Sequence, residues 1–273
     1  MNPLQDRIGL HSWTLDTTPL AEVLRIAREA GYNAVELRHI DFKRCIEAGM
    51  SNEQVLAMIR DSGIKVSCMG LESGTIFARG EEQRRLFDSM DQMCARAAAL
   101  DCEVIMVAPG TNPGGTVKEA ARNFATGGEI AEKYGLLCAL EFNSRHPVVN
   151  RLAVAREILA LANQPNCGLL IDTYHAQCAG DGGRAFEDVP ASDIIAFQFS
   201  DVPPGPISTT VTPLDRLPPG RGVVRWREVL QLLMEKGYDR YINYEAPNPA
   251  QWSRPPAEVA RAGITLIKAL LAD

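Results

Sequence analysis

Residues 194–203 read IIAFQFSDVP, an apolar run that one glutamine interrupts near its end. A continuous apolar segment of this length is typical of a β-strand that is covered on both faces, as in a parallel sheet. A buried amide without hydrogen-bond partners costs about 1–3 kcal/mol. We therefore expect neighbouring strands to place polar partners beside Gln198, and other strands of the chain should carry these partners.

Seven other short runs have the same apolar character, and longer amphipathic stretches alternate with them. Together the eight expected strands are 7–13, 34–38, 65–71, 103–109, 136–142, 167–173, 194–200 and 241–246. Stretches such as 19–31, 53–63, 83–100 and 120–135 have helical periodicity, and Gly31, Gly63, Gly135 and Gly237 each follow a helical pattern, where a left-handed C-cap favours glycine.

Eight strand–helix units over 1–273 predict a single α/β domain, a closed (β/α)8 TIM barrel. The alternative is an open, doubly wound sheet. That alternative is disfavoured because no GxGxxG motif follows the first expected strand.

The composition bounds the functional class. The chain is 46% hydrophobic and 23% charged, and no apolar run approaches the roughly 20 residues of a membrane span. The net charge of −6 and the pI near 5.4 disfavour a nucleic-acid partner, whose phosphates this surface would repel. The N-terminus lacks the pattern of a secretory signal, and seven scattered cysteines without a CxxC pair indicate reduced thiols in a cytoplasmic protein.

Polar side chains stand at the ends of the last four expected strands: Glu141, Asp172, Gln198 and Glu245. The first three are separated by roughly 30 residues, the length of one βα unit. The last interval is longer because it includes the proline-rich segment 201–222, which we interpret as a long loop on the catalytic face. On a barrel these four side chains would converge above one mouth.

Three converging carboxylates repel one another, and a divalent cation removes that conflict. Oxygen ligands favour Mg²⁺ or Mn²⁺, with Co²⁺ or Zn²⁺ as alternatives. The carbonyl oxygen of Gln198 would then be a fourth ligand beside Glu141, Asp172 and Glu245. A single acidic residue at a strand end is more often a helix cap. The prediction therefore depends on the combination of three acidic residues and one glutamine at the ends of consecutive strands.

Several motifs, ALEFN, GLLIDTYHAQCAG, FQFSD, PPGRG and YEA, resemble the sugar isomerase/epimerase superfamily of xylose-isomerase-like TIM barrels. The resemblance implies one divalent ion held by Glu141, Asp172, Gln198 and Glu245. Many members of the family carry histidine at the position of Gln198. Bacterial dehydroshikimate dehydratases of the same superfamily carry glutamine there, and they also resemble the segment SRHPVVNR at 144–151.

Other residues are candidates for substrate contact. His175 follows Asp172 by one helical turn and could bind a substrate hydroxyl or transfer a proton; a structural histidine is the alternative. Arg216 could clamp an oxyanion, carboxylate or phosphate. His146 and His11 could line the mouth, and each could equally be a packing residue.

Weaker candidates lie on other loops and strands. Glu36 in AVELR would be an interior polar group of the barrel. The segment APGTNPGG at 108–115 could cradle a phosphate, although ordinary turn chemistry explains it equally well. Gly220 and Gly222 resemble the PGxG turn of the family.

The expected activity is a metal-dependent isomerisation or epimerisation of a sugar or sugar phosphate through an enediolate. Glu141 or Glu245 would remove the proton α to a carbonyl, and the other carboxylate or His175 would return it. Loss of a β-hydroxyl instead would make the protein a lyase that acts on dehydroshikimate. The expected partner is a polyhydroxylated carbonyl compound, and a homo-oligomer is compatible with the sequence.

Two further classes fit less well. A metal-dependent abasic-site endonuclease shares the fold, but four histidines do not suffice for its histidine-rich trinuclear zinc site. A non-catalytic sugar-binding barrel would not need Glu141, Asp172, Gln198 and Glu245 together.

Overall fold

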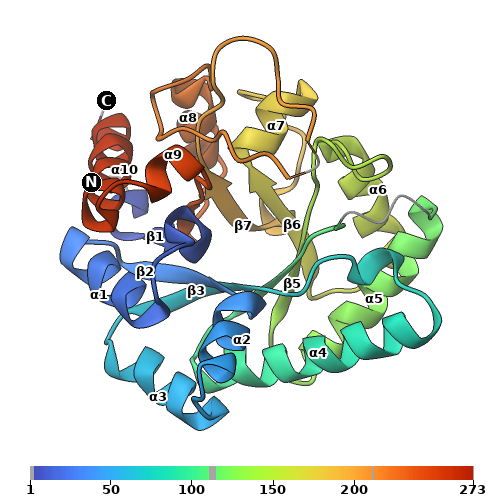
Figure 1. Cartoon of the computed structure of the whole chain (residues 1–273). Helices are drawn as coiled ribbons and strands as arrows, with labels where there is room; N and C mark the ends of the chain where they lie inside the picture. The colour runs from blue at the N-terminus through green and yellow to red at the C-terminus, as the bar shows by residue number, and fades with distance from the viewer. Residues whose placement is uncertain (1–2, 111–114, 211, 273) are drawn as a thin grey trace.

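The computed structural model describes residues 3–110, 115–210 and 212–272, and its centre is a closed barrel of eight parallel strands (Figure 1). The neighbours follow sequence order, and β8 closes on β1. The predicted TIM barrel is confirmed, and the open-sheet alternative is wrong. The strands are β1 (Ile8–His11), β2 (Ala34–Arg38), β3 (Lys65–Gly70), β4 (Val104–Val107), β5 (Leu137–Glu141), β6 (Cys167–Asp172), β7 (Ile194–Phe199) and β8 (Ile242–Tyr244).

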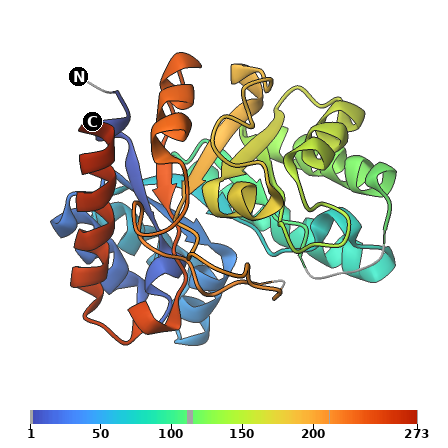
Figure 2. The ribbon, with the colours of Figure 1, turned by 90° about the horizontal axis from the view of Figure 1, so that it is seen from above.

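Helices surround the barrel, and the two ends of the chain lie side by side near α10 in both views (Figures 1 and 2). The α-helices are α1 (Leu20–Ala30), α2 (His39–Glu47), α3 (Asn52–Asp61), α4 (Gly80–Ala99), α5 (Val117–Glu132), α6 (Leu152–Ala162), α7 (Thr173–Ala179), α8 (Trp226–Glu235), α9 (Pro249–Trp252) and α10 (Pro256–Ala272). Short 3-10 turns are η1 (Pro3–Asp6), η2 (Ser12–Leu15), η3 (Thr75–Phe77) and η4 (Ala191–Asp193).

The helix ends follow the expected chemistry. Gly31 ends α1 with a φ of 90°, and its N–H donates to the carbonyl oxygens of Ala27 and Arg28 in the last turn of the helix. Gly63, Gly135 and Gly237 also have positive φ. Glycine takes this left-handed conformation without the steric cost of a side chain, which is why these four positions stop their helices as the sequence predicted.

The hydrophobic residues form two clusters, and the second cluster shows which way the polar strand ends point. The main core lies between strands and helices, while a second cluster includes Ala139, Leu170 and Ala196. These three precede Glu141, Asp172 and Gln198 by two residues on β5, β6 and β7. Since successive strand side chains alternate between faces, the polar groups point to the same interior side as the cluster.

The loop between β7 and α8 is anchored at Asp201. Its backbone pairs with Leu217 through two hydrogen bonds of 2.8 and 2.9 Å, and its carboxylate accepts from the amides of Val202 and Val224 and from the indole N–H of Trp226. A Cβ at Gly222 would collide with the carbonyl oxygen of Val202. This loop, drawn in orange in Figure 1, carries Arg216.

Other expectations have simple outcomes. All seven cysteines are free thiols, and Cys68, Cys94, Cys102 and Cys138 are buried. Among the described residues, no helix is both long and apolar enough to span a membrane. Residues 111–114 of the expected phosphate loop lie outside the described residues.

Candidate active site

The four predicted ligands lie at the same end of neighbouring strands. Glu141 and Asp172 are the last residues of β5 and β6, Gln198 pairs in register with Asp172, and Glu245 directly follows β8. Their side chains are almost fully buried, with exposed fractions of 7%, 0%, 0% and 3%. Consecutive strand ends therefore bring three acidic groups and one amide into a small buried volume.

Arg216 inserts among these carboxylates from the β7–α8 loop. Its Nη1 donates to Asp172 Oδ2 at 2.7 Å and to Glu245 Oε2 at 2.6 Å, and its side chain is 3% exposed. The guanidinium also lies 4.7 Å from the ring centroid of Tyr174, whose hydroxyl donates to Asp215. Burial alone would lower the pKa of Arg216, but Asp172, Glu245 and Glu141 raise it, so the group stays charged.

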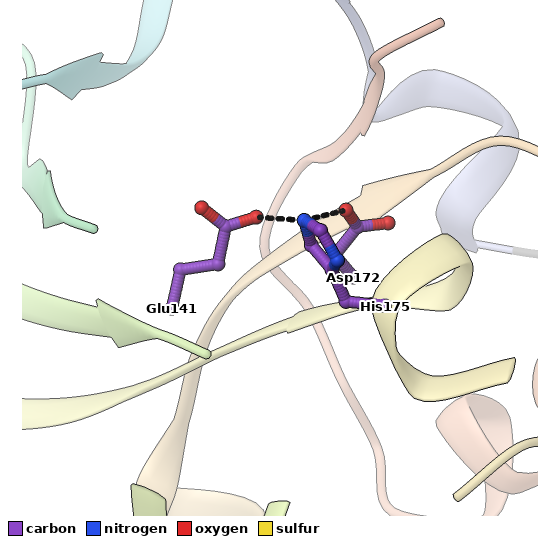
Figure 3. Close-up of side chains that lie close together, drawn as sticks. All are labelled: Glu141, Asp172 and His175. Carbon is purple, nitrogen blue, oxygen red and sulfur yellow. Dashed lines mark ion pairs between the residues drawn. The ribbon is translucent and has the colours of Figure 1, made fainter. Parts of the chain in front are cut away.

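His175 lies between two of the predicted ligands (Figure 3). Its Nε2 is 4.0 Å from Glu141 Oε1 and 3.9 Å from Asp172 Oδ2. Nη2 of Arg216 is 3.1 Å from the same nitrogen; because a guanidinium only donates, Nε2 accepts. Burial, Arg216 and Arg145 lower the pKa of His175 well below its usual value, so the ring is neutral.

The carboxylates hold protons more tightly than isolated acids. Burial raises the pKa of Glu141 well above its usual value, and Glu245 and Asp172 raise it further. Burial also raises the pKa of Asp172, to about 6, although Arg216 opposes the shift. Burial is thus the main reason that these carboxyl groups favour their neutral forms, and the neighbouring carboxylates add to it.

Glu36 of β2 is the partner of Gln198. The Gln198 amide nitrogen donates to Glu36 Oε1 at 2.9 Å across the barrel interior, and both side chains are fully buried. The carbonyl oxygen Oε1 of Gln198 is buried and accepts no hydrogen bond from the described residues. Burial raises the pKa of Glu36 to about 8, and Glu245 adds to the shift.

His11 lies on the other side of Glu245. Its Nδ1 accepts from the backbone N–H of Trp13, so the neutral ring carries its proton on Nε2. That nitrogen is 3.3 Å from Glu245 Oε1 and 3.8 Å from Glu36 Oε1. Burial, and then Arg38, lower the pKa of His11 well below its usual value. In this arrangement His11 presents a proton to Glu245.

His146 organises its own loop. Its Nδ1 accepts from the backbone amides of Val148 and Val149, and its ring stacks on Phe77 with a centroid distance of 5.1 Å. These contacts account for its burial. Contact of His146, His11 or Arg216 with substrate stays a prediction.

The residues fit a hard divalent cation. Glu141, Asp172 and His175 each offer a ligand atom, and these atoms lie within 4.8 Å of one another. The buried oxygen of Gln198, which has no hydrogen-bond partner within the described part of the chain, is the kind of atom that a cation would satisfy.

Sequence reasoning missed three contacts in this site. Glu36 was considered only an interior polar group, His175 was not considered among the metal ligands, and Ser144 was not singled out, although its hydroxyl lies 3.1 Å from His175 Nδ1. The alternation of Glu36 in AVELR placed it inside the barrel. Its pairing with Gln198 spans 162 positions of the chain and left no local signal.

Comparison with known proteins assigns the chain to a family. The model of the family described as "xylose isomerase-like TIM barrel" matches residues 24–270. An inosose isomerase of Halalkalibacterium halodurans is 25% identical over 257 residues, which cover 91% of this chain and 90% of that protein.

Solved structures are similar over nearly the whole chain. The IolI protein with a bound zinc atom has a TM-score of 0.86 at 21% identity, covering 97% of this chain and 98% of that one. A probable 3-dehydroshikimate dehydratase, AsbF of Bacillus anthracis, has a TM-score of 0.75 at 13% identity, covering 96% and 98%. The resemblance of the sequence motifs is thus confirmed, and this protein belongs to the xylose isomerase-like TIM barrel family.

Proposed function

We propose that the protein is a divalent-metal-dependent isomerase or epimerase of a polyhydroxylated carbonyl compound. The observation that carries the proposal is the buried convergence of Glu141, Asp172 and Glu245 at the carboxyl ends of β5, β6 and β8. The inosose isomerase relative makes an inosose, a cyclic keto polyol, the first substrate to test; sugars and sugar phosphates follow.

We propose Glu141, Asp172, Gln198 and Glu245 as the ligands, with Mn²⁺ or Mg²⁺ as the ion. When bound, such an ion polarises a substrate carbonyl and stabilises negative charge on its oxygen. His175 is an additional ligand candidate, because its Nε2 is close to both Glu141 and Asp172.

In this proposal, glutamate side chains of the protein transfer the protons. Glu245 accepts a hydrogen bond from Arg216 and lies 3.3 Å from His11 Nε2, so it is held in place. Glu141 lies 4.0 Å from His175 Nε2. In the proposed reaction one of these glutamates removes the proton α to the carbonyl, and the other returns it on the neighbouring carbon or the opposite face. Arg216 and the neutral His175 orient substrate oxygens.

The alternative is a dehydratase that acts on 3-dehydroshikimate. The observation that favours it is the glutamine at position 198, which resembles that group of enzymes. Both reactions begin with loss of a proton next to a carbonyl, so they share the carboxylates. They differ in whether a β-hydroxyl leaves.

One screen tests the proposal. Protein loaded with Mn²⁺ is incubated in D2O with inososes, aldoses, ketoses, their phosphates and dehydroshikimate, and the products are followed by NMR. We expect an isomer or epimer with deuterium at the carbon next to the carbonyl. An aromatic dehydration product from dehydroshikimate alone would establish the alternative, and no turnover of any compound with the metal bound would contradict both.

A further inference from the structure

We propose that Glu36 is a positioning residue that sets the orientation of the Gln198 amide toward the metal. The inference rests on the proposed metal site and assigns a role to a residue that is not itself a proposed ligand. Its basis is the cross-barrel contact between β2 and β7, in which the amide nitrogen of Gln198 donates to Glu36 Oε1 at 2.9 Å.

The contact constrains the amide because its two ends have opposite chemistry. A glutamine side chain has one accepting oxygen and one donating nitrogen, and rotation by half a turn exchanges them. In the structure the nitrogen faces Glu36 Oε1 at hydrogen-bond distance, and this oxygen accepts both in the charged carboxylate and in the acid that carries its proton on Oε2. The oxygen of Gln198 is then directed away from Glu36, and this is the atom that has no hydrogen-bond partner among the described residues.

Burial makes this preference strong. Glu36 and Gln198 are both 0% exposed, so no bulk water replaces a lost partner. A flipped amide would put an oxygen against an accepting oxygen and a donor into the metal site. An unsatisfied buried polar group destabilises the fold, so one hydrogen bond favours a single orientation of the amide. A glutamine ligand needs such a partner more than a histidine does, because either of its ends can reach the metal.

Glu36 is itself held among neighbours that keep it in place. Cys68 and Asn243 lie beside its carboxyl group and favour its charged form, and His11 Nε2 is 3.8 Å from Oε1. The acceptor is therefore part of the barrel interior rather than a mobile surface group, as a positioning residue requires.

The test measures Mn²⁺ affinity without substrate, on chelator-stripped full-length protein, by calorimetry and by the EPR signal of free Mn²⁺. Replacing the acceptor in Glu36→Leu should weaken Mn²⁺ binding about 10-fold or more. Glu36→Gln retains an accepting oxygen and should lose less. Tyr32→Phe is the matched control, because it removes one buried hydrogen bond, from the Tyr32 hydroxyl to the carbonyl oxygen of Ala260 in α10, that involves no residue of the site.

A double-mutant cycle separates positioning from general damage. In the Gln198→Ala background there is no amide to orient, so Glu36→Leu should cause no further loss of Mn²⁺ affinity. Gln198→Glu replaces the donor that faces Glu36 Oε1 with a second acid group, so the pair must either share a proton or repel, and Mn²⁺ affinity should fall. Combining it with Glu36→Gln exchanges donor and acceptor, so the double variant should regain most of the affinity even though Glu36 itself is gone.

The outcomes distinguish the two levels of the argument. Equal Mn²⁺ affinity in Glu36→Leu and wild type, with weakened binding in Gln198→Ala, would overturn the positioning role and leave the metal site intact. Unchanged affinity in Gln198→Ala would instead remove Gln198 from the site. If Glu36→Leu does not fold, the exchange pair decides: failure to recover affinity in a folded double variant contradicts the inference.

Discussion

At the scale of single residues, the site consists of charged side chains that are buried, so bulk water does not screen the interactions between them. Glu141, Asp172 and Glu245 are buried together with Arg216, and the guanidinium neutralises only part of their charge. Burial raises the pKa of Glu141 and of Asp172, and repulsion from neighbouring carboxylates adds to the shift. A buried set of like charges is costly in a folded protein and is therefore typical of a functional site rather than of a structural core.

The first prediction concerns proton transfer. Glu141→Gln and Glu245→Gln should each lower kcat about 10²–10⁴-fold, because an amide retains an oxygen ligand but cannot accept a proton. Solvent deuterium incorporation into recovered substrate measures the lost step directly. His175→Asn should be milder if His175 only orients a hydroxyl, and as severe if it carries a proton. Normal turnover in both glutamine variants is incompatible with carboxylate proton transfer.

The second prediction concerns pH and Glu36 in the metal-free protein. Its folded pKa of about 8 exceeds the ordinary value of 4.5. The unfolded chain therefore releases this proton at lower pH than the folded one, so the contribution of Glu36 to stability is complete below pH 4.5 and is lost as pH rises toward 8. The loss is about 1.4 kcal/mol for each pH unit between these values.

The measurement is the free energy of unfolding in denaturant with EDTA, at several pH values, for wild type and Glu36→Gln. The glutamine variant should lack this part of the decline, so its advantage over wild type should grow from pH 5 to pH 8. Parallel pH profiles of the two proteins would show that Glu36 titrates normally.

At the scale of elements, the β7–α8 loop delivers Arg216 to a site built by strands. Asp201, at its start, ties the loop to Leu217, Val224 and Trp226, and Asn248 donates to the carbonyl oxygen of Arg216 from the far side. The loop is long and rich in proline, yet these contacts hold the segment that carries the guanidinium.

The third prediction tests this anchoring. Asp201→Ala leaves two backbone amides and the Trp226 indole N–H without their acceptor, so the loop should shift and Arg216 should lose its alignment. A displacement near 1 Å can cost about 100-fold in rate. We expect such a loss in kcat/KM with Mn²⁺ affinity retained. Asp193→Ala, at the opposite end of β7, is the control, and equal activity of the two variants would contradict the anchoring role.

At the scale of the whole molecule, the barrel joins the proposed ligands from several strands, so metal binding should stabilise the fold as a unit. Glu141, Asp172 and Glu245 come from three different βα units, and Gln198 lies between the last two in the chain. An unfolded chain cannot bring these groups together. Because only the folded chain binds the ion, the free energy of Mn²⁺ binding adds to the free energy of unfolding of the entire barrel.

The fourth prediction follows from this linkage. At a free Mn²⁺ concentration 100 times its Kd, the free energy of unfolding should rise by about 2.7 kcal/mol, seen as a higher Tm. EDTA should reverse the shift. Gln198→Ala should show a smaller shift at the same Mn²⁺ concentration, and Tyr32→Phe, which removes a hydrogen bond to Ala260 away from the site, an unchanged one. An identical Tm with Mn²⁺ and with EDTA in wild type would contradict the proposed site.

The sequence by itself determined the barrel and the four polar strand ends. Apolar runs, helical periodicity and glycine stops are local properties, and they follow from side-chain burial and backbone sterics within a few residues. Because parallel strands of a barrel share one direction, knowing that Glu141, Asp172, Gln198 and Glu245 end their strands also placed them at one mouth.

Only the tertiary structure decided which group faces which. The bond from Gln198 to Glu36 crosses the barrel, and Arg216 enters from a loop whose path depends on the anchoring of Asp201. Such pairings depend on distances between residues far apart in sequence, and their strength depends on burial, which lowers the screening of every charge. The sequence thus specified the positions of the four proposed ligands, while the folded chain set their orientation, protonation and partners.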